Sequence, residues 1–342
     1  MKKGLRTLFG SAVISALALT ACGTSDETAQ NDGDSEAPPQ ETEEMYTVGA
    51  TQIVEHPSLD AAYEGFKTAL ADNGFVEGEN ITYNFQSAQN DQNNTGTIAN
   101  NFVADQVDLI FANSTPSALG ALNATDEIPI IFTSVTDAVS AGLVGSMDEP
   151  GENITGVVDL HPESIEKSVA FLDTYFPDSA VGLIYNSGEA NSIVQIDLVE
   201  EAMEDSSLEP VTVSVSTSAE VQQAAESLIG RADVFYVVTD NTVVSALESV
   251  VGLAEDQQIP LVVGEFDSVR RGGFMAYGFE YFDIGYESGE MAAKILSGEQ
   301  TAGDIPAQYP QSLRLMMNET ALEEQGIEWN DEWDELVEEL VE

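Results

Sequence analysis

The feature that most constrains the fold is a pattern that occurs twice. In residues 48–132, short apolar runs alternate with longer helix-like segments, and the last run reads Ile-Pro-Ile-Ile-Phe. The same order returns in residues 181–263, where the last run reads Ile-Pro-Leu-Val-Val. Near-continuous apolar strands separated by helices are typical of parallel sheets covered on both faces. The repeat therefore predicts an α/β protein made of two doubly wound parallel-sheet lobes.

We expect the chain to pass between these lobes three times. The N-terminal lobe is predicted to comprise residues 46–158 and 281–306, and the C-terminal lobe residues 159–280 and 307–342. Three crossings make a hinge that opens and closes without unfolding either lobe. From residue 323 onward, the spacing of Trp329 and Trp333 predicts a C-terminal amphipathic helix.

Polar loops follow six of the predicted strands. In doubly wound sheets, ligands bind beyond the carboxyl ends of the strands, where helices begin. For any single Ser, Thr, Asn or Asp in these loops, helix capping is an equally good interpretation. Taken together, the loops predict a polar ligand cleft between the lobes. They span residues 51–56, 112–116, 133–137, 186–192, 239–242 and 264–268.

The chain is strongly acidic, with 61 Asp and Glu residues against 10 Lys and Arg and a net charge of −51. Such a surface repels nucleic acid and denies the body polybasic contact with anionic lipid. We interpret the charge as a halophilic adaptation to high salt, where self-repulsion is screened. The carboxylates are scattered and lack the spacing of a calcium-binding loop, so no metal and no cofactor is predicted.

The N-terminus has the pattern of an export signal. Lys2, Lys3 and Arg6 precede an apolar run that is too short to span a bilayer, and small residues follow it. The segment 19–22, Leu-Thr-Ala-Cys, resembles the bacterial lipobox, which implies a signal peptide at 1–21 and a lipidated Cys22 at the new N-terminus. Because Cys22 is the only cysteine, an ordinary signal peptide with a chance cysteine is the weaker interpretation.

Residues 22–45 are polar and contain almost nothing that could enter a core, so they are predicted to form a disordered tether. The expected location is therefore the cell membrane, with the body lipid-anchored on the extracytoplasmic face.

An enzyme would need a catalytic constellation that the sequence lacks. His56 and His161 are the only histidines, and we find no phosphate loop, nucleophile elbow or zinc-protease motif. A repressor-like sensor can share a two-lobed fold, but it requires a basic DNA-binding headpiece. The chain offers an anchor and an acidic body instead, so neither an enzyme nor a nucleic-acid partner is expected.

Four segments resemble those of ABC-transporter substrate-binding lipoproteins of the tryptophan/aromatic amino acid type, which have the type I periplasmic-binding-protein fold. They are residues 51–57 (TQIVEHP), 186–192 (NSGEANS), 239–243 (TDNTV) and 278–281 (GFEY). The resemblance implies a receptor, expected to be a monomer, that captures an amino acid and delivers it to a permease and an ATPase on other chains. The expected amino acid is an aromatic one, tryptophan or phenylalanine. The alternative is a membrane-anchored ligand sensor, or a binding protein for another small solute such as a nucleoside or short peptide.

The loop chemistry suits a zwitterion, because no Lys or Arg lies in the six loops, and Arg270 and Arg271 beyond the last loop are expected to face solvent. Ser114, Thr115 and Thr136 are candidate donors to its carboxylate. Asp137, Asp240 and Asp267 are candidate partners of its ammonium group, with Asp240 the first choice. His56, Tyr185 and Phe266 are candidates for an aromatic wall, although each is also a plausible core residue. The remaining predicted ligand-binding residues are Gln52, Glu189, Asn191, Ser192 and Asn241.

The lipid anchor can be tested directly. Replacing the only thiol, Cys22→Ala, should leave an unlipidated protein that no longer partitions into detergent or membrane fractions. Fractionation followed by immunoblotting measures this, with Ser25→Ala as the control in the same segment. Membrane association equal to that of the parent would contradict the lipobox interpretation.

Overall fold

The computed structural model describes residues 45–342. The expected signal peptide, the lipidation at Cys22 and the tether up to residue 44 lie outside this range. Within the described residues, no helix has the length and apolar character needed to cross a membrane.

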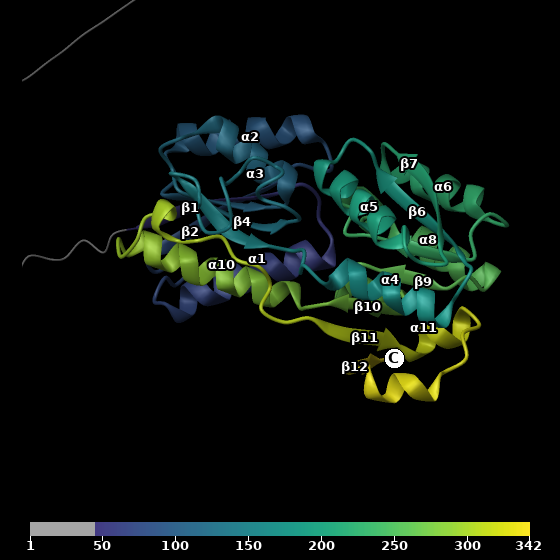
Figure 1. Ribbon diagram of the computed structural model, residues 1–342. Helices are drawn as coiled ribbons and strands as arrows, with labels where there is room; N and C mark the ends of the chain where they lie inside the picture. Colours follow the sequence, from purple (N-terminus) through teal and green to yellow (C-terminus); the bar gives the residue numbers. More distant parts are fainter. Residues whose placement is uncertain (1–44) are drawn as a thin grey trace, which may run out of the picture. The chain divides into compact units, whose positions relative to one another are not determined.

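The first sheet has five strands, all parallel, in the order β2-β1-β3-β4-β5 (Figure 1). Its strands are β1 (Tyr46–Gln52), β2 (Ile81–Ser87), β3 (Leu109–Asn113), β4 (Ile130–Val135) and β5 (Ile154–Val158). The helices of this lobe are α1 (Pro57–Asp72), α2 (Gln92–Asp105), α3 (Thr115–Ala124) and α10 (Tyr281–Leu296), with the short η2 (Ala302–Asp304) after α10. Strands β3, β4 and β5 are buried along their whole length, as expected for a sheet covered on both faces.

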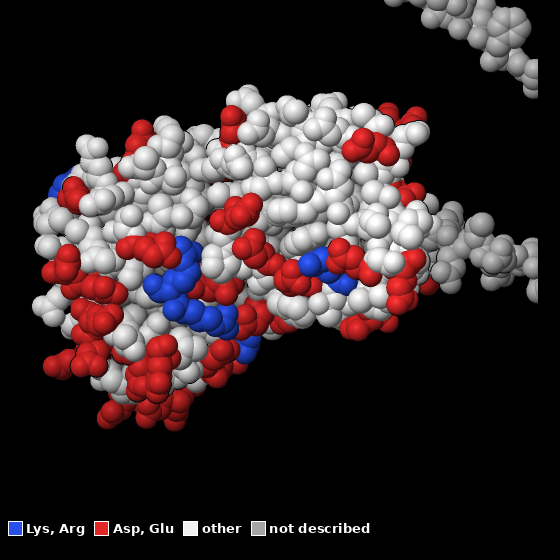
Figure 2. All heavy atoms as spheres, turned by 180° about the vertical axis from the view of Figure 1, so that it is seen from behind, with Lys and Arg blue, Asp and Glu red and all other residues white. Residues whose placement is uncertain are grey.

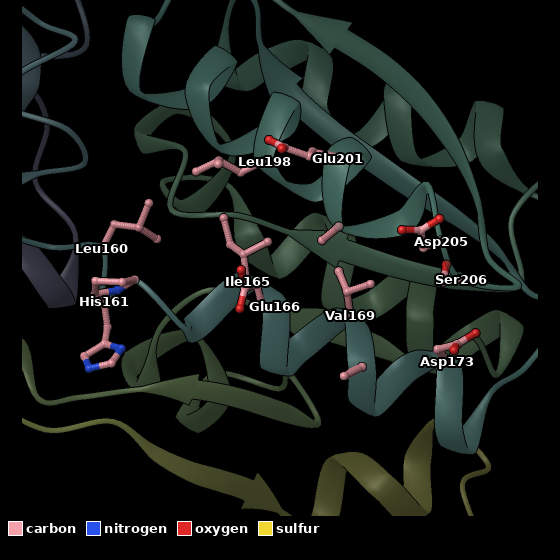
Figure 3. A pocket seen from close by; sticks show the side chains of 13 residues that line it. Leu160, His161, Ile165, Glu166, Val169, Asp173, Leu198, Glu201, Asp205 and Ser206 are labelled. Atoms are coloured by element: carbon pink, nitrogen blue, oxygen red, sulfur yellow. The ribbon is translucent and has the colours of Figure 1, made fainter.

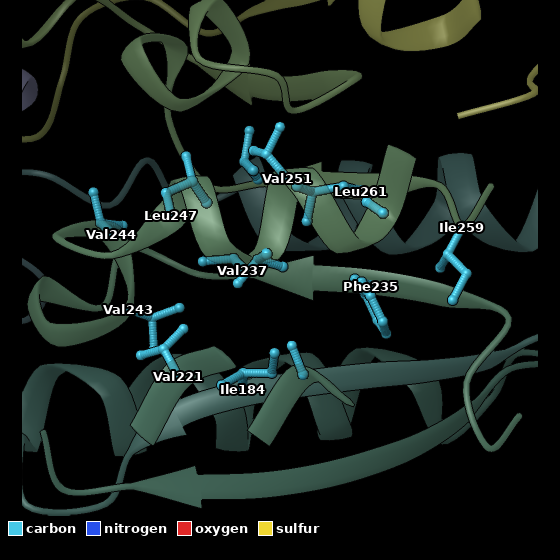
Figure 4. Packing of buried hydrophobic residues seen from close by; sticks show 14 of the residues in the cluster. Ile184, Val221, Phe235, Val237, Val243, Val244, Leu247, Val251, Ile259 and Leu261 are labelled. Carbon is cyan, nitrogen blue, oxygen red and sulfur yellow. The ribbon is translucent and has the colours of Figure 1, made fainter. Parts of the chain in front are cut away.

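The second sheet has the order β12-β11-β10-β9-β8-β6-β7. Its strands are β6 (Ala180–Asn186), β7 (Glu209–Val215), β8 (Val234–Val237), β9 (Leu261–Val263), β10 (Met275–Gly278), β11 (Arg314–Asn318) and β12 (Glu339–Val341). Its helices are α4 (Ser164–Tyr175), α5 (Ala190–Met203), η1 (Ser218–Glu220), α6 (Val221–Leu228), α7 (Asn241–Val244), α8 (Leu247–Gln257), α9 (Phe266–Arg270), α11 (Glu319–Glu324) and η3 (Asp331–Glu335). Branched aliphatic side chains such as Val237 and Leu261 pack around Phe235 between the sheet and α8 (Figure 4).

The predicted class, α/β with two parallel-sheet lobes, is confirmed, with one addition. Strand β11 pairs antiparallel to β10, whereas the other strand pairs of both sheets are parallel. The chain passes between the sheets after β5, after β10 and before β11. The connections therefore bring three segments together at the base of the two lobes.

Helices α1 and α10, which are far apart in sequence, pack against each other almost backbone to backbone (Figure 1). A Cβ on Gly285 would lie 1.9 Å from the carbonyl oxygen of Ala62, and one on Gly65 would lie 2.1 Å from that of Phe282. Gly289 is similarly close to Phe66. Gly285 contacts Ala62, and Gly289, one turn later, contacts Phe66, one turn later on the other helix. The two helices therefore run parallel and begin at the same end of the lobe.

The prediction of a C-terminal amphipathic helix from residue 323 onward is wrong. Helix α11 ends at Glu324, Gly326 follows with a φ of 72°, and residues 339–341 form β12 beside β11. One of the two tryptophans of this segment does pack into the protein: Trp333 is buried and contacts the rings of Phe171 and Tyr175. The free edge of β11 offers backbone hydrogen bonds that a surface helix could not satisfy.

On the face shown in Figure 2, acidic side chains are numerous, above all in the lower half of the view, and the basic ones gather in a few places. Arg270 donates from Nη1 to Oε2 of Glu280 at 3.0 Å, and Arg314 donates to Glu339 at 3.1 Å. Glu280 caps α10 and Glu339 lies in β12. Two of the few cations of this acidic chain therefore join segments next to the crossings.

The contact between α1 and α10 predicts a large effect of one methyl group. Gly285→Ala should lower the free energy of unfolding by about 1–3 kcal/mol, because the added Cβ forces the two backbones apart. Gly252→Ala in α8 is the matched control, since its Cβ would meet nothing within 4 Å. That control should be neutral or stabilising, by up to about 1 kcal/mol. Urea unfolding of both variants measures the difference, and an equal stability for both would contradict the packing argument.

Candidate functional site

A small cavity is lined by residues of both lobes, most of which lie in the last residues of a strand or in the loop or first helical turn that follows it. Its free volume is about 10 Å³, which is room for roughly one water molecule. This position agrees with the cleft expected between doubly wound sheets. The lining residues are His56, Leu59, Ser134, Thr136, Asp159, Asn191, Thr239, Asn241, Val244, Glu265 and Tyr281.

Several polar atoms of this wall are buried and lack a hydrogen-bond partner of good geometry. They are Nδ1 of His56, Oγ of Ser134, Oδ1 of Asp159, Oδ1 of Asn191 and Oε2 of Glu265. Buried polar atoms are nearly always paired in folded proteins, because an unpaired one costs roughly 1–3 kcal/mol. A cluster of such atoms around one cavity therefore indicates a site that a polar ligand completes.

Two of these residues are buried carboxylates, Asp159 and Glu265. Oδ2 of Asp159 accepts a hydrogen bond of 2.6 Å from the hydroxyl of Tyr281. Oε1 of Glu265 accepts from the backbone N–H of Ser268 at 2.9 Å and from the hydroxyl of the same residue. Within the described residues, neither carboxylate forms an ion pair with a Lys or Arg. The cavity is therefore suited to a cationic group.

Burial raises the pKa of both carboxyls. For Asp159 it raises the pKa to about 6, opposed in part by the hydroxyls of Tyr281 and Thr136. For Glu265 the pKa is raised first by burial and then by the charge of Asp267. At neutral pH Asp159 therefore carries a charge that the ligand-free protein does not neutralise.

His56 ends the loop after β1 and is the N-cap residue of α1. Burial, together with a smaller effect of the charge of Arg271, lowers its pKa to about 3, and an interaction with Asn241 opposes the shift in part. The imidazole is therefore neutral at physiological pH. Arg271 does not face solvent as expected: its side chain is 16 % exposed and donates to the carbonyl of Val244 at 2.9 Å.

Glu189 organises the second lobe's part of the wall. This buried carboxylate accepts from Nδ2 of Asn241 at 2.6 Å and from the hydroxyl of Thr242 at 2.7 Å. Longer bonds come from Asn186 and Asn191. Glu189 thus joins the loop after β6 to the loop after β8, and it holds the two asparagines that line the cavity.

Three pairs of residues form hydrogen bonds between the lobes beside the cavity. Asn90 donates to the hydroxyl of Thr242 at 3.0 Å, and Gln92 donates to the carbonyl of Gly188 at 2.9 Å. Gln195 donates to the hydroxyl of Thr136 at 3.1 Å. The lobes are therefore held close together around the cavity.

Among the sequence-predicted residues, His56, Thr136, Asn191 and Asn241 line the cavity, and Glu189 supports them. The three aspartates expected near the ammonium group do not line it. Asp240 is fully buried and accepts from the backbone N–H groups of Asn186 and Val243 at 2.6 and 2.8 Å, as the N-cap of α7. Burial, then the charge of Glu189, raises the pKa of Asp240 to about 6. Its contacts favour the capping interpretation.

Asp137 and Asp267 also have local partners. Asp137 accepts from the N–H groups of residues 139 and 140 and so closes a turn, and Asp267 pairs with Arg270 at 3.4 Å. Phe266 packs in the core of the second lobe beneath Arg314, and Tyr185 packs against the other core of that lobe. Of the expected aromatic wall, only His56 lines the cavity.

The remaining predicted residues lie behind the wall. Gln52 donates to Asp60 and accepts from Asn113 inside the first lobe. Ser114, Thr115 and Ser192 are buried but do not line the cavity. Ser114 has a φ of 118° and a ψ of 156°, a region that side chains other than glycine rarely enter. Such strain at a strand end is typical of functional sites.

Sequence reasoning did not name Asp159, Tyr281, Ser134 and Glu265, which line the cavity. Asp159 directly follows β5, an apolar run that lies beyond the repeated pattern of residues 48–132 and was not recognised as a strand. Recognising that run as a strand would have placed Asp159 at a carboxyl end like the other candidates. Glu265 lies in the predicted polar loop 264–268, but the sequence analysis named Asp267, not Glu265, as the candidate partner of an ammonium group in that loop.

A larger hollow of about 620 Å³ lies on the surface of the second lobe between α4 and α5 (Figure 3). Its floor includes Ile165 and Val169, and exposed acids such as Glu166 and Glu201 stand at its rim. Within the described residues, none of the buried polar atoms without a partner belongs to this groove. The groove therefore lacks the unsatisfied polar groups that mark the interlobe cavity as a ligand site.

The fold and the interlobe cavity are those of a two-lobed solute-binding protein. Residues 47–340 match the family "ABC transporter substrate binding protein", and the chain belongs to that family. Members of this family bind solutes outside the cytoplasm and are not enzymes. The tyrosine-binding protein of Clostridioides difficile strain R20291 is 41 % identical over 324 residues, which cover 94 % of this chain and 91 % of that protein.

Two solved structures are informative about the arrangement of the lobes. An ABC domain from Streptococcus pneumonia in complex with L-Trp is 27 % identical, has a TM-score of 0.82, and is matched over 87 % of this chain and 100 % of its own. The ligand-free, open structure of a substrate binding protein with adhesive properties from Clostridium difficile is 41 % identical but has a TM-score of only 0.64, over 87 % and 99 %. The arrangement of the lobes is therefore nearer to that of the tryptophan complex.

The raised pKa of Asp159 predicts a stability effect with a definite sign. Its contribution to folding is present below the unfolded pKa of about 3.8 and is lost as pH rises through about 6. Asp159→Asn should therefore stabilise the ligand-free protein at pH 7.5 by about 1–3 kcal/mol, and the gain should vanish near pH 4. Thermal unfolding at both pH values measures this.

Asp173→Asn is the control for this measurement, because Ser207 holds the pKa of that exposed carboxyl below its usual value. This control should show no gain at pH 7.5. A melting temperature of Asp159→Asn at or below that of the parent at pH 7.5 would contradict the assignment of an uncompensated charge.

Proposed function

We propose that this protein captures an aromatic amino acid in the interlobe cavity and delivers it to an ABC permease for import. The observation that carries the proposal is the pair of buried carboxylates, Asp159 and Glu265. Neither has a cation partner among residues 45–342, and both face a cavity with further unsatisfied atoms. An α-ammonium group supplies three donors and a positive charge, and so would satisfy both carboxylates.

The rest of the wall suits the remainder of an amino acid. Ser134 has an unpaired hydroxyl that can donate to the ligand carboxylate. Among residues 45–342, no Lys or Arg lines the cavity, which disfavours phosphates and dicarboxylates as ligands. The aromatic class is supported by two relatives, one named for tyrosine and one solved with L-Trp.

Ligand entry requires the lobes to separate, because a cavity of about 10 Å³ cannot hold an aromatic amino acid. The interlobe bonds of Asn90, Gln92 and Gln195 break on opening and re-form on closure. A ligand that bonds to Ser134 and Asp159 in one lobe and to Glu265 in the other stabilises the closed form over the open one.

The proposal includes the anchor inferred from the N-terminal sequence. A lipid on Cys22 would hold the binding protein, as a monomer, on the extracytoplasmic face of the membrane near its permease. The charge of −51 would keep the body soluble and away from anionic lipid.

Binding can be tested by calorimetry with the twenty amino acids, nucleosides and short peptides. The parent should bind aromatic amino acids, and Asp159→Asn and Glu265→Gln should each lose tens- to thousands-fold in affinity, equivalent to about 2–5 kcal/mol for an unpaired buried charge. Because the pKa of Asp159 is about 6, parent affinity should fall between pH 7 and pH 5, and Asp159→Asn should lack this dependence.

Asp240→Asn discriminates between the two assignments of the ammonium partner. Because both of its oxygens bond to backbone N–H groups, the structure predicts little change in affinity, whereas the choice made from sequence predicts lost affinity at unchanged stability. Asp137→Asn serves as a control for a carboxylate outside the cavity. Parental affinity in both Asp159→Asn and Glu265→Gln would overturn the site, and binding of only nucleosides or peptides would overturn the ligand class.

A further inference from the structure

Gln195 of α5 is buried between two residues of the cavity wall that belong to different lobes. Its side chain is 2 % exposed, and it does not itself line the cavity. Thr136 directly follows β4 in the first lobe, Thr239 lies in the loop after β8 in the second lobe, and both line the cavity. Gln195 therefore lies behind the wall, at a point where the parts contributed by the two lobes meet.

The hydrogen bonds determine the orientation of the Gln195 amide. Its Oε1 accepts from the backbone N–H of Thr239 at 3.1 Å and from the hydroxyl of the same residue at 2.9 Å. A backbone N–H can only donate, so the amide atom that meets it must be the oxygen. The amide nitrogen, Nε2, is left to donate to the hydroxyl oxygen of Thr136 in the other lobe, at 3.1 Å. One amide group thus joins the two lobes in a defined orientation.

The other two interlobe pairs lose less when their bond is removed. Gln92 is exposed where it donates to the carbonyl of Gly188, so water can take its place. Thr242, the partner of Asn90, has two further bonds inside its own lobe.

The hydroxyl of Thr242 accepts from Asn186 at 2.9 Å and donates to Glu189 at 2.7 Å, so it stays paired without Asn90. The bond between Gln195 and Thr136 differs from both, because each of its side chains is buried. Water cannot easily replace a lost partner at this contact while the lobes are together.

We propose that Gln195 is a positioning residue for closure: it holds the closed form by joining Thr136 to Thr239, and it acts through these residues without contacting the ligand. This inference rests on the proposed function and adds to it the residue that determines how long the closed form lasts. Removing the amide leaves the hydroxyl oxygen of Thr136 without this donor in the closed form, whereas water reaches that oxygen once the lobes separate.

The closed form is therefore destabilised selectively, because an unpaired buried group costs more than a hydrogen bond contributes. Affinity then falls by the same factor for every ligand that needs the closed form, since less of the protein occupies that form. A residue that contacts the ligand would instead affect different ligands to different extents.

The test variant is Gln195→Met, which keeps the length of the side chain and removes the amide. Single-molecule fluorescence measures the lifetime of the closed form, with labels on Thr97→Cys in α2 and Gln222→Cys in α6. Both label sites are exposed and lie on different lobes (Figure 1). A Cys22→Ala background makes them the only thiols of the chain.

With saturating tyrosine or tryptophan, Gln195→Met should shorten the lifetime of the closed form roughly 10- to 100-fold. Calorimetry should show the Kd values for tyrosine and tryptophan raised by one common factor, and binding at higher concentration shows that the variant is folded. Gln92→Met is the matched control, because its bond is exposed, and it should change the lifetime and both Kd values less than about threefold.

A double-mutant cycle tests whether Gln195 acts through Thr136. Thr136→Val removes the acceptor in the first lobe, and the double variant Gln195→Met/Thr136→Val should lose less lifetime than the sum of the two single losses on a logarithmic scale. If Gln195→Met does not fold, Thr136→Val alone carries the lifetime measurement. Fully additive losses would overturn the inference.

A parental closed-form lifetime in Gln195→Met would also overturn it, whatever happens to the melting temperature. Weaker binding of one amino acid only, at an unchanged lifetime, would make Gln195 a ligand contact and leave the proposed function standing. If the parent binds no aromatic amino acid, the proposed function fails. The lifetimes of the closed form in the ligand-free parent and in Gln195→Met then decide on Gln195 separately.

Discussion

The close contact between α1 and α10 is the constraint on which the site depends. Gly65, Gly285 and Gly289 let the two helix backbones touch, and the helices run parallel, so both begin at the same end of the first lobe. One helix begins after His56 and the other at Tyr281, and both residues line the cavity. A packing contact without side chains therefore positions two site residues that lie 225 positions apart, and it ties the second hinge crossing to the first lobe.

The unsatisfied groups around the cavity destabilise the ligand-free fold. Asp159 and Glu265 are buried with raised pKa values, and neither has a cation partner within the described residues. The strained backbone of Ser114 adds to this cost at a neighbouring strand end. Proteins keep such groups where function needs them, because a ligand that supplies the missing charge recovers the free energy on binding. Instability before binding and affinity for a cation thus have the same physical origin.

The contacts that hold the two lobes together beside the cavity are polar. Asparagine and glutamine side chains make the interlobe bonds, and these groups can exchange protein partners for water with little net change in free energy. At the second crossing, a charged pair joins Arg270 of the second lobe to Glu280, the N-cap residue of α10. The lobes can therefore separate at the cavity while the crossing segments still connect them.

The sequence alone determined the two-sheet architecture, because the periodicity of strands and helices is a local pattern and this pattern occurs twice along the chain. It also identified loops that contribute His56, Thr136, Asn191 and Asn241 to the cavity wall, since strand ends can be located from the same periodicity. Only the tertiary structure decided which carboxylates face the cavity. Both carboxylate oxygens of Asp240 accept hydrogen bonds from backbone N–H groups. Asp159 instead accepts from Tyr281, which lies 122 positions away in sequence, and its other oxygen has no partner of good geometry. Likewise, residues 339–341 became a strand because β11 offered an open edge. Capping partners and sheet edges depend on contacts between distant segments, and no local pattern encodes them.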